Sequence, residues 1–386
     1  MKRRLLWISV LVLLLPLIAS CGRDRFSAHG WAGLTIDGDV LYVAAGEGRV
    51  TALNISRDAG DNRGNPERLW TPFPADGQDN LGAVYGAPLV GAFAEDGVVG
   101  STNIFLATYE NPEDNDDISA NLFAIDATTG TQNWAASVPG PVVGSPTLVG
   151  NTLVVGTTHG LLYALAIESD ERALPRSAWR EFEADGKVWS AATVAEGTLY
   201  FGSLGHTVYA VNATDGTEIW SYEVGGAVVG SPLVMDGTVY VGALDRSLYA
   251  LDANTGDQKW KFSGDNWFWA APVSDGRTIY AATLGGTVYA IDLLGREVWS
   301  SPTEVSGSVL AAPVVLSNTL IVATDNKQVH QLSLSDGREE WSIGIGEMVR
   351  ADIVSQGERV YIIDTEGVVH ALDADRRIEL WTYPTR

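Results

Sequence analysis

The stretch VVGSPLVMDGTVYVGALDRSLYALDANTGDQKW, residues 228–260, decides the fold. It holds a short apolar segment, an Asp-Gly turn at residues 236–237, and the alternating runs VYVGA (239–243) and LYALD (248–252). Apolar residues at every second position between glycine-containing turns are typical of short antiparallel strands. The stretch therefore predicts a four-stranded meander. Because such a sheet is apolar on both faces, it must stack against further copies of itself.

Copies of this unit occupy nearly the whole chain. The second strand recurs eight times, from LYVAA (41–45) to VYIID (360–364), and the third strand recurs from VTALN (50–54) to VHALD (369–373). The unit closes each time on a tryptophan, namely Trp70, Trp134, Trp179, Trp220, Trp260, Trp299, Trp341 and Trp381. Eight copies predict an all-β fold, an eight-bladed β-propeller of four-stranded antiparallel sheets that forms one domain over residues 31–386.

The sequence leaves two possibilities for the closure of the ring, and it places histidines at two positions where tyrosine is usual. The last blade either packs face to face on the first, or residues 26–31 add an edge strand. His330 and His370 stand where the third strand usually carries tyrosine, and we expect both to pack in the core.

The N-terminus predicts export and lipidation. Lys2, Arg3 and Arg4 precede an apolar run of 14 residues, too short to span a bilayer comfortably. The sequence Ile-Ala-Ser-Cys at residues 18–21 resembles a bacterial lipobox, so we expect a signal peptide at residues 1–20, lipid on Cys21 and a tether over residues 21–30. The alternative is an ordinary signal peptide. A lipid anchor would hold the ring outside the cytoplasm, and on the periplasmic face of the outer membrane if the cell has two membranes.

The charge of the chain restricts its partners. Removal of the three basic residues of the signal peptide leaves 22 Lys and Arg against 48 Asp and Glu, a net charge of −26. Such a surface repels polyphosphate backbones and anionic headgroups, which argues against nucleic-acid binding. It favours a soluble, monomeric ring. Cys21 is the only cysteine, so the exported domain can form no internal disulfide.

Insertions concentrate in the first three blades, at residues 56–68, 92–103, 110–121 and 166–178. They predict loops on the rims, where partners usually meet a propeller, although tolerated loop growth is the alternative. The insertion at residues 110–121 carries Asp114, Asp116 and Asp117, whose oxygens suit Ca²⁺. A solvated acidic loop is the simpler interpretation, and no metal is expected.

The segments AIDATTGTQNW (124–134), AVNATDGTEIW (210–220) and ALDANTGDQKW (250–260) resemble the tryptophan-docking motif of the PQQ-type propellers. The residues at 290–299 and 371–381 are weaker copies. One branch of that superfamily, the quinoprotein dehydrogenases, implies PQQ and Ca²⁺ in the channel. The other, the BamB-type lipoproteins, implies a non-enzymatic scaffold of outer-membrane β-barrel assembly. Lipobox, chain length and regular blades match the second branch, which implies envelope proteins as partners, no cofactor and no enzymatic activity.

Aromatic residues precede several of the innermost strands. Trp31, Tyr85, Trp189, Trp267, Trp269 and Arg350 all lie in such segments, so several are expected near one mouth of the channel. Aromatic rings around a funnel can bind a flat cofactor, a sugar or an apolar side chain. Packing of the inner lining is the alternative. Under the dehydrogenase-like or sugar-binding hypothesis, Trp189, Trp267, Trp269 and Arg350 are the candidate binding residues.

Overall fold

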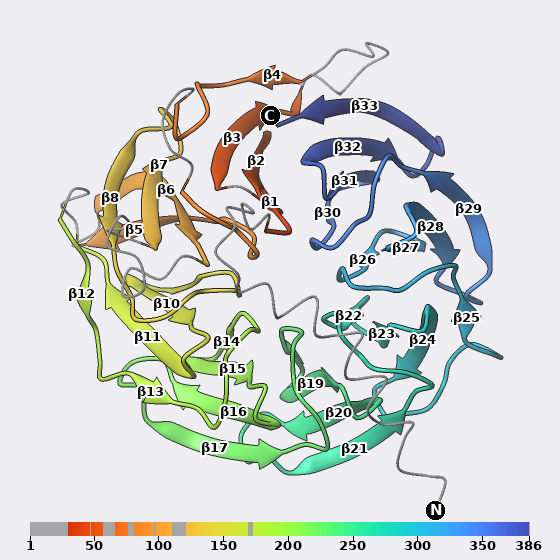
Figure 1. The fold of residues 1–386 in the computed structure, drawn as a ribbon. Helices are drawn as coiled ribbons and strands as arrows, with labels where there is room; N and C mark the ends of the chain where they lie inside the picture. The colour runs from red at the N-terminus through yellow and green to blue at the C-terminus, as the bar shows by residue number, and fades with distance from the viewer. Residues whose placement is uncertain are drawn as a thin grey trace, which may run out of the picture.

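Eight antiparallel sheets are arranged radially around a central channel (Figure 1). The computed structural model describes residues 30–46, 48–56, 66–75, 81–95, 98–109, 121–168 and 173–385, and these ranges contain no α-helix. The predicted all-β, eight-bladed β-propeller is therefore confirmed. We number its blades 1 to 8 along the chain. In the same ranges no helix has the length and apolar character needed to cross a bilayer.

The strands follow the sequence in order from blade to blade. Blades 1 and 2 consist of β1 (Gly33–Asp37), β2 (Val40–Ala45), β3 (Arg49–Asn54), β4 (Glu67–Arg68), β5 (Leu89–Glu95), β6 (Val98–Ala107), β7 (Leu122–Asp126) and β8 (Gln132–Ala136). Blades 3 and 4 consist of β9 (Thr147–Val149), β10 (Thr152–Gly156), β11 (Leu161–Ala166), β12 (Arg176–Ser177), β13 (Phe182–Glu183), β14 (Thr193–Ala195), β15 (Thr198–Gly202), β16 (Thr207–Asn212) and β17 (Glu218–Glu223). Blades 5 and 6 consist of β18 (Leu233–Met235), β19 (Thr238–Ala243), β20 (Ser247–Asp252), β21 (Gln258–Ser263), β22 (Val273–Ser274), β23 (Thr278–Ala282), β24 (Thr287–Asp292) and β25 (Thr303–Glu304). Blades 7 and 8 consist of β26 (Val314–Val315), β27 (Thr319–Ala323), β28 (Gln328–Ser333), β29 (Glu339–Gly344), β30 (Val354–Gln356), β31 (Arg359–Ile363), β32 (Val368–Asp373) and β33 (Ile378–Pro384).

Each blade is a meander whose first strand borders the channel and whose last strand forms the outer edge (Figure 1). Two blades depart from the simple pattern. In blade 3 the outer strand is split into β12 and β13, which both pair with β11. In blade 2 the predicted rim loop at residues 92–103 is largely strand, because β5 and β6 pair as a long hairpin with a register shift between Ala92 and Ala94. Paired strands satisfy the backbone hydrogen bonds that a loop would leave to water.

The core lies between the blades. In β19, Val239 and Val241 face blade 4, whereas Tyr240 between them faces blade 6. The whole strand is buried. Each of the eight interfaces between neighbouring blades holds one such apolar cluster of described residues. Since burial of one Val or Leu contributes about 1.5–3 kcal/mol, a blade without neighbours would lose most of its stabilisation.

The ring closes by face-to-face packing of blade 8 on blade 1. One apolar cluster joins Leu34 and Leu41 of blade 1 to Tyr361 and Val369 of blade 8. On the rim, Gln356 Nε2 donates a hydrogen bond to the carbonyl of Gly38 at 2.7 Å. In the part of the chain that the structure describes, blade 8 consists of the C-terminal strands β30 to β33 and no N-terminal strand joins it. Phe26, which belongs to the alternative with an added edge strand, lies outside the described residues.

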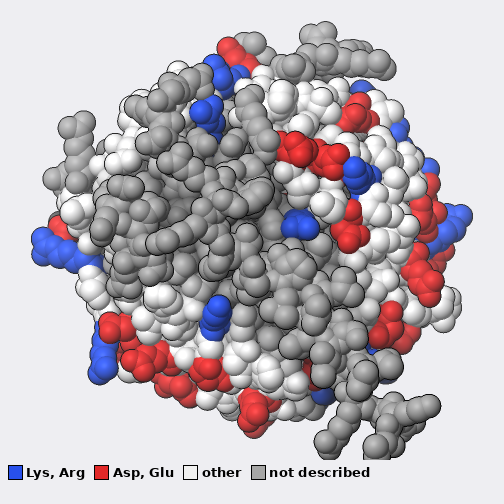
Figure 2. Space-filling model, viewed as in Figure 1, with Lys and Arg blue, Asp and Glu red and all other residues white. Residues whose placement is uncertain are grey.

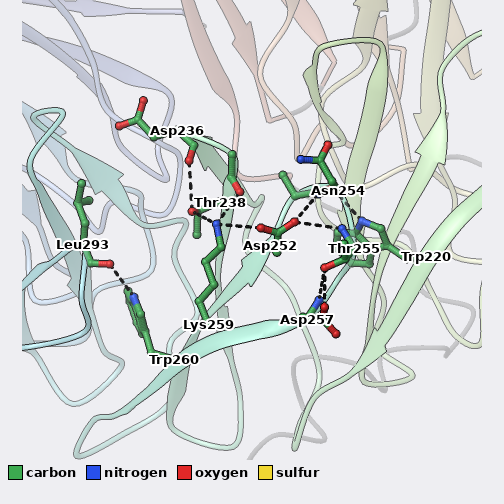
Figure 3. Close-up of polar contacts among 12 residues, drawn as sticks. Trp220, Asp236, Thr238, Asp252, Asn254, Thr255, Asp257, Lys259, Trp260 and Leu293 are labelled. Atoms are coloured by element: carbon green, nitrogen blue, oxygen red, sulfur yellow. Dashed lines mark hydrogen bonds and ion pairs between the residues drawn. The ribbon is translucent and has the colours of Figure 1, made fainter.

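Tryptophans at the ends of the repeats dock each blade on the next. Examples among the described residues are the indole N–H groups that donate to carbonyl oxygens of the following blade, Trp70 to Ala127, Trp179 to Ala213, Trp220 to Ala253, Trp260 to Leu293 and Trp299 to Leu334. In the loop that contacts the Trp220 indole, Asp252 accepts hydrogen bonds from the backbone N–H groups of Asn254 and Thr255 and forms an ion pair with Lys259 at 3.2 Å (Figure 3). This Asx turn shapes the loop on which the indole lies.

Gly256 in that loop is required both for its positive φ and for the close approach of the Trp220 indole, and mutation can separate the two effects. Gly256 has φ +78°, and a Cβ there would lie 2.8 Å from Trp220 Cδ2. Gly237 also has a positive φ, +64°, but nothing lies within 4 Å of its Cβ position. We expect Gly256→Ala to lower the free energy of unfolding by about 2–3 kcal/mol and Gly237→Ala by about 1 kcal/mol. Urea denaturation of both variants measures the difference, and equal losses would show that the indole contact contributes nothing.

Candidate functional site at the channel mouth

One residue from each blade enters the channel at the same repeat position. It lies four residues before the first strand of blades 2 to 8 and two residues before β1 in blade 1. We call these eight the mouth ring: Trp31, Tyr85, Val143, Trp189, Val229, Trp269, Leu310 and Arg350. Seven are apolar or aromatic, and Arg350 carries the only charge among them. They line a cavity of about 110 Å³ at the axis of the propeller.

Two residues further along, the chain places small side chains in the channel. We call this second layer the throat ring: Gly33, Ala87, Ser145, Ala191, Ser231, Ala271 and Asp352. Its polar members connect neighbouring blades, because Ser145 and Ser231 accept the N–H groups of Ala87 and Ala191 at 2.8 and 3.1 Å. Small residues are needed here, since a Cβ on Gly33 would lie 2.5 Å from the Cα of Ala87.

Trp31 closes the mouth across the channel. Its ring meets Tyr85 edge-on at 5.3 Å between centroids and Trp269, from blade 6, at 6.3 Å. Both are favourable aromatic geometries. The guanidinium carbon of Arg350 lies 5.9 Å from the Trp31 ring centroid, within cation–π range. Blades far apart in the sequence therefore share one aromatic cluster at the axis.

Two hydrogen-bond donors of the mouth ring have no partner. Trp189 Nε1 and Arg350 Nε are both buried and unsatisfied, and Arg350 forms no hydrogen bond or ion pair with the described residues. Leaving such donors unpaired is unfavourable by about 1–3 kcal/mol each. The mouth ring is therefore suited to a hydrogen-bond acceptor with negative charge, such as a carboxylate.

Asp352 supplies the one carboxyl group of the throat ring. The surrounding protein raises its pKa above the ordinary value by desolvation, which the hydrogen bond from the N–H of Ala312, at 2.7 Å, only partly opposes. Its side chain is exposed to the channel and lines the cavity there. Proton uptake by Asp352 would make the throat neutral and would increase the attraction of the mouth for an anion.

The family model described as outer membrane protein assembly factor BamB matches residues 67–188, 172–303 and 284–386 of this chain, well over half of its length. The chain belongs to this family. Among solved structures, BamB from Moraxella catarrhalis is similar with a TM-score of 0.66 and 16% identity, over 90% of this chain and 95% of that chain. The computationally designed Ika8 protein is similar with a TM-score of 0.71 and 13% identity, over 90% and 97%. At these identities both structures show a shared fold alone. No curated protein matches the chain.

In this BamB-family propeller, the structure brings together most of the residues expected at the mouth. Trp189, Trp269 and Arg350 line the cavity with Trp31 and Tyr85. Trp267 does not line it. Two positions earlier in the repeat, its backbone carbonyl accepts the N–H of Leu284 at 2.9 Å on the rim. Cys21, Asp114, Asp116 and Asp117 lie outside the described residues.

Sequence reasoning missed Asp352. Its signal was present, because blade 8 reads Arg350-Ala351-Asp352 where the repeat at residues 229–231 reads Val-Gly-Ser. Superposing the repeats position by position places both charged residues in the channel. The serines of the throat ring could have been found in the same way.

The size of the cavity decides what the mouth can hold. Its 110 Å³ equals the volume of a few water molecules, at about 30 Å³ each, and is well below the roughly 300–1,000 Å³ of small-molecule sites. No group of three or more His, Cys, Asp or Glu among the described residues is placed to hold a metal ion. PQQ with Ca²⁺, which only the dehydrogenase-like resemblance implies, does not fit these residues. A single side chain or a carboxylate group does fit.

The face of the ring drawn in Figure 2 is mainly acidic along its edge. Figure 2 shows Asp and Glu side chains gathered along the edge of this face, over the outer strands, with fewer and more isolated Lys and Arg. Several rim carboxylates are structural. Asp185 accepts hydrogen bonds from Ser203 and Thr207, which hold its pKa below the ordinary value against desolvation, and Asp265 accepts bonds from Thr283 and Thr287 at 3.0 and 2.7 Å.

Proposed function

We propose that this BamB-family propeller is a non-catalytic scaffold of the cell envelope, anchored by lipid on Cys21, that binds other envelope proteins. The observation that carries the proposal is the family match over residues 67–386 on a regular eight-bladed ring. The family name describes an assembly factor, a class of protein that works through contacts with other proteins. A lipid on Cys21 would keep the monomeric ring at a membrane surface, where such partners are assembled.

The outer edges of four blades support this proposal. The last strands β17, β21 and β29 have six residues each and β33 has seven, whereas β4 and β25 have two. A long outer strand presents backbone N–H and C=O groups to which a partner can add a strand. The acidic surface favours a partner with a basic face. Blades 4, 5, 7 and 8 are therefore the docking edges that we propose.

Affinity capture from native envelopes tests the proposal. The lipidated protein is cross-linked in cells, solubilised and purified, and specific envelope proteins are expected at near-stoichiometric amounts. Cys21→Ser is the matched control, which should release the protein from the membrane and reduce recovery of membrane-embedded partners while leaving the ring folded. Recovery of no protein partner from either form would contradict the scaffold.

A dehydrogenase-like or sugar-binding propeller is the second candidate, favoured only by the unpaired donors of Trp189 and Arg350 at the aromatic mouth. Thermal shift with PQQ and Ca²⁺, together with a panel of sugars, distinguishes it from the scaffold. A rise in melting temperature that is lost in Trp189→Phe, with reduction of an electron-accepting dye, would favour the enzyme. We expect neither.

A further inference from the structure

A second, larger cavity lies between blades 7 and 8, lined by none of the residues of the channel mouth. Its volume is about 410 Å³, within the range of small-molecule sites. We call it the 7/8 cavity. The residues that matter to its chemistry are Thr319, Gln331, Glu340, Glu358, Asp375 and Arg377.

The 7/8 cavity exists because the docking motif fails at this junction. Arg377 has φ +58° and occupies the repeat position of Gly337, where a Cβ would lie 2.6 Å from Trp299 Cε3. An arginine side chain there leaves no room for Trp341 to lie flat on the turn. Consistently, Trp341 donates no hydrogen bond to the described residues, unlike Trp299, whose N–H reaches Leu334 at 2.9 Å.

A buried amide faces the space that results. Gln331 is 4% exposed and stands where the third strand of the seven other blades carries alanine, namely Ala52, Ala124, Ala164, Ala210, Ala250, Ala290 and Ala371. Its Nε2 donates to Thr319 Oγ1 at 3.2 Å, but its Oε1 is buried without a partner. A buried acceptor left unpaired is unfavourable. A ligand that donates a hydrogen bond to Gln331 Oε1 would remove that penalty.

The charges around the 7/8 cavity define the ligand further. The lining carries three carboxylates, from Glu340, Glu358 and Asp375, and one guanidinium, from Arg377. That guanidinium is already paired with Glu340 at 2.7 Å. Glu358 accepts only a long hydrogen bond, 3.3 Å, from the N–H of Ser317. The lining is therefore negative overall and offers acceptors rather than donors.

We propose that the 7/8 cavity binds a cationic hydrogen-bond donor, a guanidinium or primary ammonium group, which donates to Gln331 Oε1 and is held by the carboxylates of Glu358 and Asp375. Two departures from the repeat, alanine to Gln331 and glycine to Arg377, meet at one junction and together create both the space and the acceptor. The group is carried either by a free amine or by a Lys or Arg side chain of a protein partner.

Calorimetric titration of the folded exported domain at low salt tests the proposal, with arginine amide and putrescine as probes. We expect at least one to bind, and Gln331→Ala to weaken it by about tenfold, the loss of one hydrogen bond to a charged group. Because alanine is the residue of the seven other blades, this variant should fold with an unchanged or higher melting temperature. Asp375→Asn should also weaken binding, whereas the exposed Glu297→Gln on blade 6 should not.

The two sources are distinguished with the blocked peptide acetyl-Ala-Arg-Ala-amide. If the cavity takes a side chain from a partner, the peptide binds at least as tightly as arginine amide and loses affinity in Gln331→Ala. If it takes a free amine, the peptide is excluded and putrescine or arginine amide still binds. Absence of binding by all three probes, or equal affinity in wild type and Gln331→Ala, would overturn the proposal. Neither outcome bears on capture of envelope partners at the blade edges.

Discussion

Trp220→Ala is expected to lower the free energy of unfolding by about 3–5 kcal/mol, the range for removal of a buried tryptophan. Trp220 is 7% exposed, packs on Tyr200 with ring centroids 5.9 Å apart, and donates a hydrogen bond to the carbonyl of Ala253 at 2.8 Å. Its ring also covers Gly256. Truncation removes the apolar contact between two blades, leaves a cavity and removes one of the two hydrogen bonds that the Ala253 carbonyl accepts, the other being donated by Tyr200 Oη at 3.0 Å. These three losses add.

Trp341→Ala is the matched control, because it removes the same residue from the same repeat position. Since Trp341 has no hydrogen bond to blade 8 among the described residues and is only partly buried, we expect less than half the loss found for Trp220→Ala. Equilibrium denaturation followed by circular dichroism measures both. Similar losses for the two variants would show that docking at the 7/8 junction is as strong as elsewhere, and would contradict our account of the cavity there.

Most of the fold could be predicted from the sequence because one pattern is repeated eight times. Alternation in VYVGA and LYALD predicts strands with two apolar faces, and strands with two apolar faces require stacked neighbours. The extended hairpin of β5 and β6 was not predicted, because the glycines and charges around Glu95 are equally typical of a loop. Pairing in that segment depends on the register between the two strands, which residue composition does not determine.

The candidate site was predictable only in part. Aromatic residues before the inner strands indicated the mouth, but Trp267 and Trp269 are indistinguishable by alternation, since residues two apart share a face. Only their distance from the inner strand places Trp269 at the axis and Trp267 on the rim. For the 7/8 cavity, the unusual residues could be identified from the sequence but their proximity could not. Gln331 and Arg377 break the repeat visibly, but they lie 46 positions apart, and their meeting follows from the packing of one blade on the next.

His370→Gln is expected to lower the free energy of unfolding by about 3 kcal/mol near pH 5.5, the low end for removal of one partner of a buried ion pair. His370 is 4% exposed, with Nδ1 2.8 Å from Glu379 Oε1 and Nε2 3.2 Å from Asp364 Oδ2. Asp364 is also buried, at 2%. The low end of the range of losses is expected because Asp364 Oδ1 would still accept hydrogen bonds from the backbone N–H groups of Glu366 and Val368, both at 2.9 Å.

The loss should depend on pH in a defined direction. Desolvation lowers the pKa of His370, but the hydrogen bonds and charges of Asp364 and Glu379 outweigh it, and the pKa is raised. The stabilisation from His370 is therefore complete below its unfolded pKa, about 6.5, and is lost as the pH rises through the raised folded value. The pKa of Asp364 is lowered, against desolvation, by the bond to His370 and by backbone N–H groups. Its contribution is present above about pH 3.9 and is lost as the pH falls through the lowered folded value.

The difference in stability between wild type and His370→Gln should thus be largest between about pH 4 and 6.5 and should shrink toward alkaline pH. His330→Gln is the control, at the equivalent position of blade 7. His330 is equally buried, but its only polar side-chain contact among the described residues is a 3.4 Å approach of Nδ1 to Glu339, and its Nε2 has no partner there. We expect a loss below about 1 kcal/mol, without the same pH profile. Denaturation across this pH series checks both, and a difference for His370→Gln that grows with pH would reverse the assignment of His370 as the charged partner of Asp364.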